Sequence, residues 1–262
     1  MRTDVNAFLG AYPFRREAAA TAARLLEAMD RVDTYDAWVS WLPAVTGRET
    51  GDKGIRPLEA AVRGAERLRP VPSLAPGRRG WERGLARAKD LGAPAVRCDP
   101  TFLELDPCGP EMRAVVDACA ANNVPLMLAV RLEDGRQRVP EDTSPELPPW
   151  AVRTLVRHNR QARLIVTHAD RGFIEEVHFG STPEEAERLW WDIAWIWGPP
   201  EDHLETLVGT MGVGRFVFGS GMPLRLPDAA VAKLDLLDLA PAVRAAVERG
   251  NVERLAPGPR PS

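Results

Sequence analysis

The feature that most constrains the fold of this 262-residue chain is a regular alternation between short apolar runs and longer segments with helical periodicity. Several of the short runs, such as LMLAV at 126–130 and RFVF at 215–218, are continuously apolar. Runs of this kind are typical of strands that are buried on both faces. We predict strands at 3–9, 35–41, 70–74, 94–99, 125–132, 163–168, 190–195 and 215–220.

The segments between these strands show the three- and four-residue apolar spacing of helices that cover a sheet. They lie at 16–30, 81–91, 111–122, 150–159, 183–188, 228–237 and 241–248, and we predict that Gly250 ends the last of them. Strands that alternate with helices form a parallel sheet, and eight such repeats close into a barrel. We therefore predict an α/β fold, a (β/α)₈ (TIM) barrel over residues 1–255, followed by a flexible tail at 256–262. An open doubly wound sheet is the rival, but no glycine-rich fingerprint follows the first strand.

Composition limits the partners of such a barrel. The formal net charge is −3, which argues against nucleic acid or an anionic membrane as the partner. The three cysteines have no metal-site spacing, and neither a signal peptide nor an apolar stretch of about 18 residues is present. We predict a cytoplasmic protein with a small-molecule partner and no membrane contact, and the sequence leaves a homo-oligomer open.

Two long connections, at 42–57 and 133–149, follow predicted strands at the carboxyl ends, where barrel enzymes hold their active sites. We expect proton transfers there from carboxylates beside a histidine, and binding of a small anionic, planar ligand by arginine and tryptophan. The candidate catalytic residues are His168, Asp4, Asp192, Asp99 and Glu133, and the candidate substrate-binding residues are Arg97, Arg131, Asn6 and Trp41. This hypothesis requires that Arg97 and Arg131 face the barrel mouth and are not already held in ion pairs.

A structural role competes with each of these assignments. Asp4 and Arg97 would neutralise each other across the barrel wall. Glu133 and Asp134 would order their own loop, and His168 would be held by a neighbour at its strand end.

Three stretches resemble the amidohydrolase superfamily, in its branch of amidohydrolase-related hydrolases and decarboxylases. The stretch from Asp4 to Gly10, DVNAFLG, is similar to that family's opening D-x-H-x-H strand. ARLIVTH, ending at His168, resembles its strand-six motif, and GRFVFGSGMP at 214–223 resembles its closing R-x-x-F-G-S-D-x-P motif. The resemblance extends to an Asn-x-x-Arg-Leu ending at 251–255, and it implies a barrel with hydrolase or decarboxylase activity.

The departures from the family pattern concern its metal ligands. Asn6 and Phe8 stand where the family has two strand-one histidines, and Gly221 stands where it has the strand-eight aspartate. The strand-five ligand position falls near Ala129 or Arg131, so only His168 remains, whereas catalytic zinc needs about three protein ligands. The resemblance therefore implies a degenerate metal site, and we expect no cofactor. It also extends to an uncharacterised subgroup, through Pro-Phe-Arg at 13–15 and Glu-Asp-Gly-Arg at 133–136.

Three functions remain open from the sequence. The first is a hydrolase or lyase that acts on a small anionic molecule without the usual metal centre. The second is a non-catalytic protein that binds a ligand or a partner, which a barrel mouth plugged by apolar side chains would favour. The third is a metal-dependent hydrolase with a divalent metal such as zinc on an unusual ligand set, namely Asp4, Asn6, His168 and Asp192, which convergence of these side chains on one point would favour.

Overall fold

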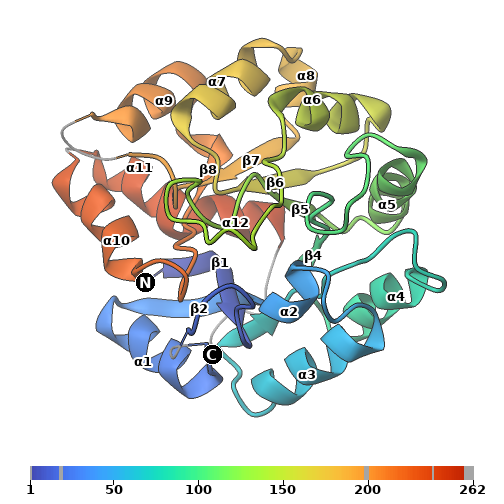
Figure 1. The fold of residues 1–262 in the computed structure, drawn as a ribbon. Helices are drawn as coiled ribbons and strands as arrows, with labels where there is room; N and C mark the ends of the chain where they lie inside the picture. Colours follow the sequence, from blue (N-terminus) through green and yellow to red (C-terminus); the bar gives the residue numbers. More distant parts are fainter. Residues whose placement is uncertain (1, 18–19, 198–200, 238, 257–262) are drawn as a thin grey trace.

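The computed structural model describes residues 2–17, 20–197, 201–237 and 239–256. Its eight strands are surrounded by helices, as Figure 1 shows looking along the strands. The strands are β1 (Arg2–Leu9), β2 (Thr34–Trp41), β3 (Leu68–Pro70), β4 (Val96–Arg97), β5 (Leu126–Ala129), β6 (Leu164–Thr167), β7 (Leu189–Asp192) and β8 (Phe216–Val217). Each predicted strand therefore has a counterpart, although the hydrogen-bonded part is shorter in most of them.

Neighbouring strands pair in parallel and in chain order, as β1-β2-β3 and as β4-β5-β6-β7-β8. A parallel bridge between Ser73 and Arg97 joins the chain after β3 to β4. Val5 N donates to Phe218 O at 2.9 Å, which joins β1 to the end of β8. These contacts close the strands into a ring, and the predicted (β/α)₈ barrel is confirmed.

The barrel interior is packed rather than hollow. One buried cluster takes residues from strands on all sides of the ring: Val5, Trp38, Val71, Met127, Ile165 and Val217. Val252 and Leu255 belong to the same cluster and cover it at the amino-terminal ends of the strands, where Arg163, just before β6, donates to Leu255 O. The outward-facing residues of β4 to β8 form a second, larger cluster beneath the surrounding helices. Polar side chains can therefore gather in the barrel only at the carboxyl ends of the strands.

The helices alternate with the strands around the ring (Figure 1). They are α1 (Ala22–Arg31), α2 (Leu42–Val45), α3 (Asp52–Val62), α4 (Glu82–Asp90), α5 (Pro110–Ala121), α6 (Pro149–His158), α7 (Arg171–Phe179), α8 (Pro183–Ala186), α9 (His203–Met211), α10 (Pro227–Leu236), α11 (Pro241–Ala245) and α12 (Asn251–Leu255). The side chain of Thr21 caps α1 by accepting from Arg24 N, so this helix begins later than the predicted residue 16.

Two helix predictions were wrong. Residues 42–57 were expected to form a long connection, but they contain α2 and much of α3, which continues through Pro57. Gly250 does not end the last helix, because 246–250 form one wide helical turn that runs directly into α12. Burial of Val252 and Leu255 under the barrel explains why the helix continues past a residue that often stops one.

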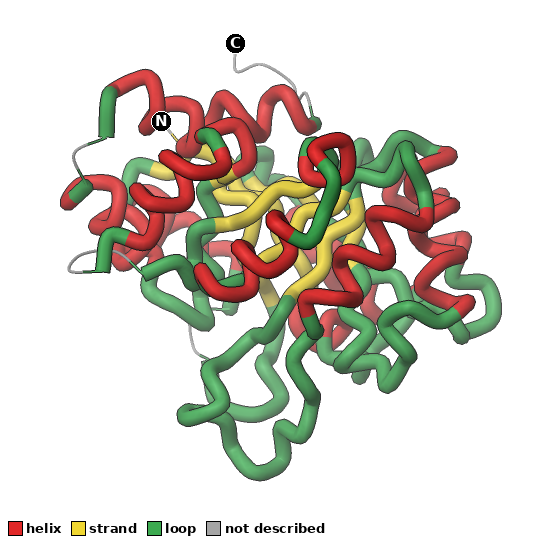
Figure 2. The backbone as a smooth tube through the Cα atoms, turned by 90° about the horizontal axis from the view of Figure 1, so that it is seen from above, coloured by secondary structure: helices red, strands yellow, loops and turns green. Residues whose placement is uncertain are grey.

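The second long connection, after β5, has no helix or strand and lies in front of the strands in Figure 1. Figure 2 shows long loops gathered beyond one end of the strands. The predicted tail lies outside the described residues, apart from Ala256. Within the described ranges, no helix has the length and apolar character needed to cross a membrane.

Candidate active site

A buried hydrogen-bond network at the carboxyl ends of the strands is centred on Asn6 of β1. The Asn6 amide nitrogen lies 2.8 Å from His168 Nε2 and donates to Asp192 Oδ2 at 2.7 Å. Its amide oxygen accepts from Arg97 Nη2 at 2.7 Å. All four side chains are buried, so the strand ends of β1, β4, β6 and β7 are linked away from solvent.

The protonation of His168 follows from its partners. Its Nδ1 lies 2.6 Å from the carbonyl oxygen of Arg131, and a carbonyl can only accept, so Nδ1 carries the hydrogen. Nε2 is then an acceptor for the amide of Asn6. Burial lowers the pKa of His168 to about 3, and nearby arginines add to this effect. The imidazole is therefore neutral at physiological pH, which suits a hydrogen-bond acceptor rather than an acid or a base.

Two carboxyl groups, Asp192 of the network and Asp4 beside it, have pKa values near neutrality. Burial raises the pKa of Asp192 to about 6, although its hydrogen bonds from His168 N and Asn6 oppose the shift. Burial likewise raises the pKa of Asp4 to about 7. Asp4 accepts from Ser220 Oγ at 2.5 Å and from Ser220 N at 3.0 Å, which ties the start of the barrel to the turn after β8. Groups that titrate near pH 7 can both take up and release a proton during a reaction.

Arg97 is held inside the barrel rather than presented to the mouth. Its Nε donates to Ser40 Oγ at 3.2 Å, and its guanidinium carbon lies 5.0 Å from the ring centre of Phe8. Nη1 is 3.8 Å from Asp99 Oδ2, and burial raises the pKa of Asp99 to about 6. Of the described atoms, none forms a hydrogen bond with Arg97 Nη1 or Asp99 Oδ2. Arg97 therefore offsets buried negative charge. The structural role predicted for Arg97, neutralising a carboxylate across the barrel wall, is directed at Asp99 rather than at Asp4.

Arg131, which was predicted to bind the anionic ligand together with Arg97, has acidic partners of its own. Arg131 Nη2 lies 3.0 Å from Glu146 and 3.0 Å from Asp170, so this guanidinium is already held in ion pairs. Glu146 belongs to the long loop after β5, which folds back toward its own strand. The sequence could not show this, because a loop without periodicity carries no signal of what it contacts.

Glu133 and Trp41 also make contacts other than those predicted. Glu133 forms an ion pair with Arg15 at 3.1 Å, and burial raises the pKa of this carboxyl. Trp41 donates through Nε1 to Glu49 at 2.8 Å. Asp134, beside Glu133, pairs with Arg136 at 2.8 Å, which fits the predicted loop-ordering role. These residues join the loops around the barrel mouth, whereas Asn6, Arg97, His168 and Asp192 form the buried network.

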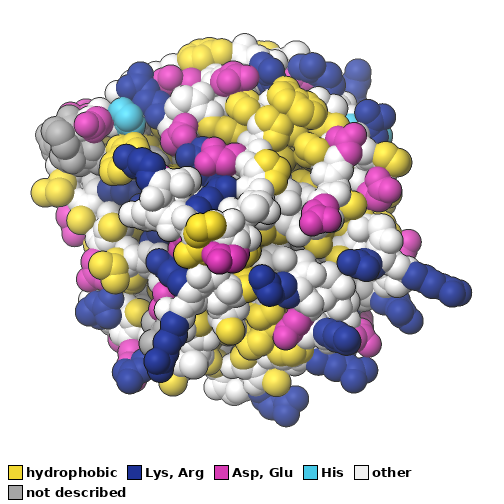
Figure 3. All heavy atoms as spheres, viewed as in Figure 1, with side chains coloured by type: hydrophobic (Ala, Val, Ile, Leu, Met, Phe, Trp, Pro, Cys, Tyr) yellow, Lys and Arg dark blue, Asp and Glu magenta, His cyan; other side chains and the backbone are white. Residues whose placement is uncertain are grey.

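An apolar layer covers the mouth above this network. It consists of residues from the ends of strands, from α2 and from loops: Phe8, Tyr12, Leu42, Val45, Ala129, Leu132 and Leu224. Arg15 reaches across it and donates to Leu224 O at 2.9 Å. On the molecular surface viewed along the same direction, positive and negative side chains are interspersed (Figure 3). A ligand reaching the network must displace part of the apolar layer.

Arg225, which follows the glycine-rich turn after β8, was not among the predicted site residues. Its guanidinium carbon lies 4.4 Å from the ring centre of Trp195, and the Trp195 ring is 6.2 Å from that of His168. The side chain is half-buried. The signal available in the sequence was its place two residues after the GRFVFGSGMP stretch at 214–223. Arg225 therefore stands beside the network at the mouth.

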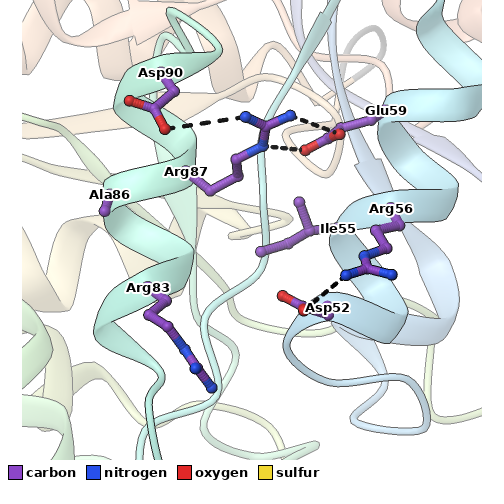
Figure 4. A pocket seen from close by; sticks show the side chains of 8 residues that line it. All are labelled: Asp52, Ile55, Arg56, Glu59, Arg83, Ala86, Arg87 and Asp90. Carbon is purple, nitrogen blue, oxygen red and sulfur yellow. Dashed lines mark hydrogen bonds and ion pairs between the residues drawn. The ribbon is translucent and has the colours of Figure 1, made fainter.

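A cavity of about 380 Å³ lies on the outside of the barrel, between α3 and α4 (Figure 4). Its charged side chains largely pair with one another: Arg87 with Glu59 at 2.6 Å, and Arg56 with Asp52 at 3.4 Å. None of the predicted site residues lines it. We therefore place the candidate site at the strand ends and not in this cavity.

The raised pKa values predict an unusual pH dependence of stability. Asp4, Asp192 and Asp99 have folded-state pKa values above their ordinary value, so they stabilise the fold at low pH and lose this effect as pH rises through 6 to 7. His168 acts oppositely, because its lowered pKa makes the fold lose stability below pH about 6.5. Three carboxyl groups outweigh one imidazole, and we expect the free energy of unfolding to be about 2 kcal/mol higher at pH 5.5 than at pH 8.

Urea unfolding at the two pH values measures this difference. The variant Asp4→Asn should show a clearly smaller difference than the wild type, because the group with the highest folded pKa no longer titrates. A wild type that is less stable at pH 5.5 than at pH 8 would contradict the raised pKa values.

Comparison with solved structures finds the same architecture. An uncharacterised TIM-barrel protein from Bordetella bronchiseptica superimposes with a TM-score of 0.70 at 14% identity, covering 97% of each chain. A 2,6-dihydroxybenzoate decarboxylase from Rhizobium has a TM-score of 0.68 at 14% identity, covering 97% of this chain and 98% of its own. A dihydroxybenzoic acid decarboxylase from a Polaromonas species, with bound manganese and the inhibitor 2-nitroresorcinol, has a TM-score of 0.70 at 14% identity and covers 97% and 96%. No protein-family model and no curated protein sequence matches the chain.

The expectation that the chain needs no cofactor is contradicted by the last of these structures, which contains manganese. The residues of this chain do not fit such an ion in the arrangement described. The nitrogen of Asn6 lies between His168 Nε2 and Asp192 Oδ2, and an amide nitrogen donates hydrogen bonds but offers a metal no lone pair. The alternative ligand set does not converge either, since no three His, Cys, Asp or Glu side chains of the described chain could hold one ion.

The observed fold and the comparisons with solved structures both indicate a TIM barrel. The structural similarity covers 97% of the chain at a TM-score of 0.70. Because the sequence identity is 14%, this similarity establishes the fold and no more. The chain therefore has the TIM-barrel fold found in the dihydroxybenzoate decarboxylases, as the amidohydrolase resemblance implied.

Proposed function

We propose that this chain is an enzyme of the hydrolase or lyase class that acts on a small anionic molecule at the carboxyl ends of the barrel strands. The observation that carries this proposal is the single buried network that joins Asn6, His168, Asp192 and Arg97. Burying four polar side chains costs free energy unless each is paired. A network of this kind at the end of a barrel where active sites lie is a functional-site signature.

In this proposal Asp192 is the proton-transfer group. Its pKa of about 6 leaves both protonation states accessible near neutrality, so it can give a proton to a substrate and later recover one. Asn6 and the backbone amide of His168 hold its two oxygens in place. The neutral imidazole of His168 orients Asn6, and Arg97 supplies positive charge without contacting the ligand.

The decarboxylases with the same fold support the class of ligand. The Rhizobium protein is a 2,6-dihydroxybenzoate decarboxylase, and the Polaromonas protein binds 2-nitroresorcinol as an inhibitor. Both names describe compact aromatic molecules that carry acidic groups. A planar ligand of this type would be suited to the aromatic and cationic side chains near His168.

A turnover screen tests the proposal. Purified protein, with and without added manganese, is incubated with a panel of small aromatic and aliphatic carboxylic acids, esters and lactones, and carbon dioxide release and acid release are followed. We expect turnover of at least one compound, and Asp192→Asn should lower kcat by about 100- to 10,000-fold.

The matched control is Asp117→Asn on α5, an exposed carboxylate whose hydrogen-bond partners in the described part of the chain are His158 and Asn159. This variant should keep wild-type kcat. Equal activity of Asp192→Asn and Asp117→Asn would contradict the role of Asp192, and the absence of turnover with every compound would contradict the enzyme proposal.

One observation favours a second candidate, a non-catalytic protein that binds a ligand or partner. The apolar layer formed by Phe8, Leu132, Leu224 and their neighbours covers the network, whose side chains are at most 1% exposed. Binding of small carboxylates without turnover would support this candidate over the enzyme.

A further inference from the structure

Arg225 differs from the other arginines at the barrel mouth in having no polar partner. Across residues 2–17, 20–197, 201–237 and 239–256, no side-chain hydrogen bond or ion pair reaches its guanidinium. Arg15 is paired with Glu133, and Arg131 with Glu146 and Asp170. The side chain of Arg225 is half-buried, so its guanidinium donors can be taken up by a ligand without breaking an existing hydrogen bond within the described chain.

The surroundings of Arg225 direct it toward the buried network. A side chain on Gly221 would lie 3.4 Å from Arg225 Cδ and 2.7 Å from His168 Nε2, so Gly221 separates the two residues. On the other side, the guanidinium carbon is 4.4 Å from the ring centre of Trp195. Trp195 Nε1 is buried and also lacks a partner in the described chain. The Arg225 guanidinium and an unsatisfied Trp195 donor therefore lie close together and next to His168.

We propose that Arg225 is the group that binds the ligand's carboxylate, and that the site takes a small monocarboxylate in preference to a dicarboxylate. This inference rests on the proposed function for the location of the ligand. A guanidinium binds a carboxylate through two parallel charge-assisted hydrogen bonds, which would satisfy Arg225. The ring of Trp195 keeps the guanidinium oriented by a cation–π contact.

The preference for one negative charge follows from the charges around the site. Arg131, the other guanidinium near Trp195 at 5.3 Å, is already neutralised by Glu146 and Asp170. A second carboxylate on the ligand would lie near these carboxylates and near Asp192 and Asp134, both of which interact with Arg225, and like charges repel. Lys233, the other cation that interacts with Arg225, donates to the carbonyl oxygens of Ile193 and Ala194 at 2.8 Å each. Arg225 is therefore the cation of this group whose donors remain available to a ligand.

Calorimetric binding of benzoate to the full chain tests the inference. We expect Arg225→Gln to raise the dissociation constant for benzoate by about 10- to 100-fold, because a charge-assisted bidentate contact is lost. The dissociation constant of Arg225→Lys should lie between those of this variant and the wild type. Lysine keeps the positive charge but cannot form the two parallel hydrogen bonds of a guanidinium. Phthalate, which adds a second carboxylate to the same ring, should bind the wild type at least about tenfold more weakly than benzoate.

The matched control is Arg48→Gln, which removes an exposed guanidinium that lies 5.5 Å from the ring centre of Phe14. Its benzoate affinity should stay within about twofold of the wild type, since only long-range attraction is removed. Equal losses in Arg225→Gln and Arg48→Gln, phthalate binding tighter than benzoate, or no benzoate binding would each overturn the inference.

Failure of the proposed function has a different signature. A wild type that turns over no acid but binds benzoate in an Arg225-dependent way would contradict the enzyme and support the carboxylate site. Turnover of a monocarboxylate with a KM unchanged by Arg225→Gln would support the enzyme and overturn the site.

Discussion

Replacing Arg97 by leucine is expected to lower the free energy of unfolding by about 3–5 kcal/mol at pH 7, the range for removing one partner of a buried ion pair. The guanidinium is 1% exposed and stands 3.8 Å from Asp99, whose carboxylate would be left without its counter-charge. The amide oxygen of Asn6 and the hydroxyl of Ser40 would lose their donors as well. Urea unfolding followed by circular dichroism measures the change.

The pH dependence of this loss separates charge from packing. At pH 5 most of Asp99 is protonated, because its pKa is about 6, so the loss in Arg97→Leu should be smaller than at pH 7. Arg87→Leu is the control, since its ion pair with Glu59 is solvent-exposed and such pairs contribute less than about 1 kcal/mol. If the two variants lose the same stability, the buried pair has no structural role.

The second large effect is expected at Gly221, where alanine should cost about 2–4 kcal/mol. The backbone φ angle is +75°, a conformation that costs an alanine about 1 kcal/mol relative to glycine. In addition, the new methyl group would lie 2.7 Å from His168 Nε2, and overpacking of this kind typically costs 1–3 kcal/mol. The variant should also disturb the hydrogen bond from Asn6 to His168, which shares the same nitrogen.

Gly64 is a matched control for the backbone contribution. Its φ angle is +78°, and a methyl group there would meet no atom within 4 Å. Gly64→Ala should therefore cost only about 1 kcal/mol, and the difference between the two variants measures the contact with His168. Equal costs at the two positions would mean that the network moves freely to accommodate the methyl group.

Much of the site was predictable because parallel strands end at the same edge of a barrel. Four polar residues lie in or directly after separate strands near their carboxyl ends, and their position in the chain was enough to expect them together: Asn6, Arg97, His168 and Asp192. The hydrogen bonds among them were not predictable. Asn6 and His168 are 162 positions apart, and which nitrogen donates is set by the Arg131 carbonyl on the far side of the ring.

The roles of the arginines could not be read from their positions either. Arg97 and Arg131 both follow strand-like runs and were given the same function, yet one lies inside the barrel and the other is held by Glu146 and Asp170. Arg225 looked unremarkable among 34 lysines and arginines until its lack of partners was seen in three dimensions. Ion pairing depends on which loops fold back, and loops without periodicity carry no such signal.

The amino-acid sequence by itself determined the barrel. A strand that is buried on both faces is continuously apolar, and a helix that is buried on one face has apolar residues every three or four positions, so both patterns can be read from neighbouring residues. It also determined that polar side chains would gather at one end. Only the tertiary structure decided which of them pair with one another, which are covered by the apolar layer and which one is left unpaired. Those outcomes depend on contacts between residues that are distant in the chain, and the local pattern contains no information about such distances.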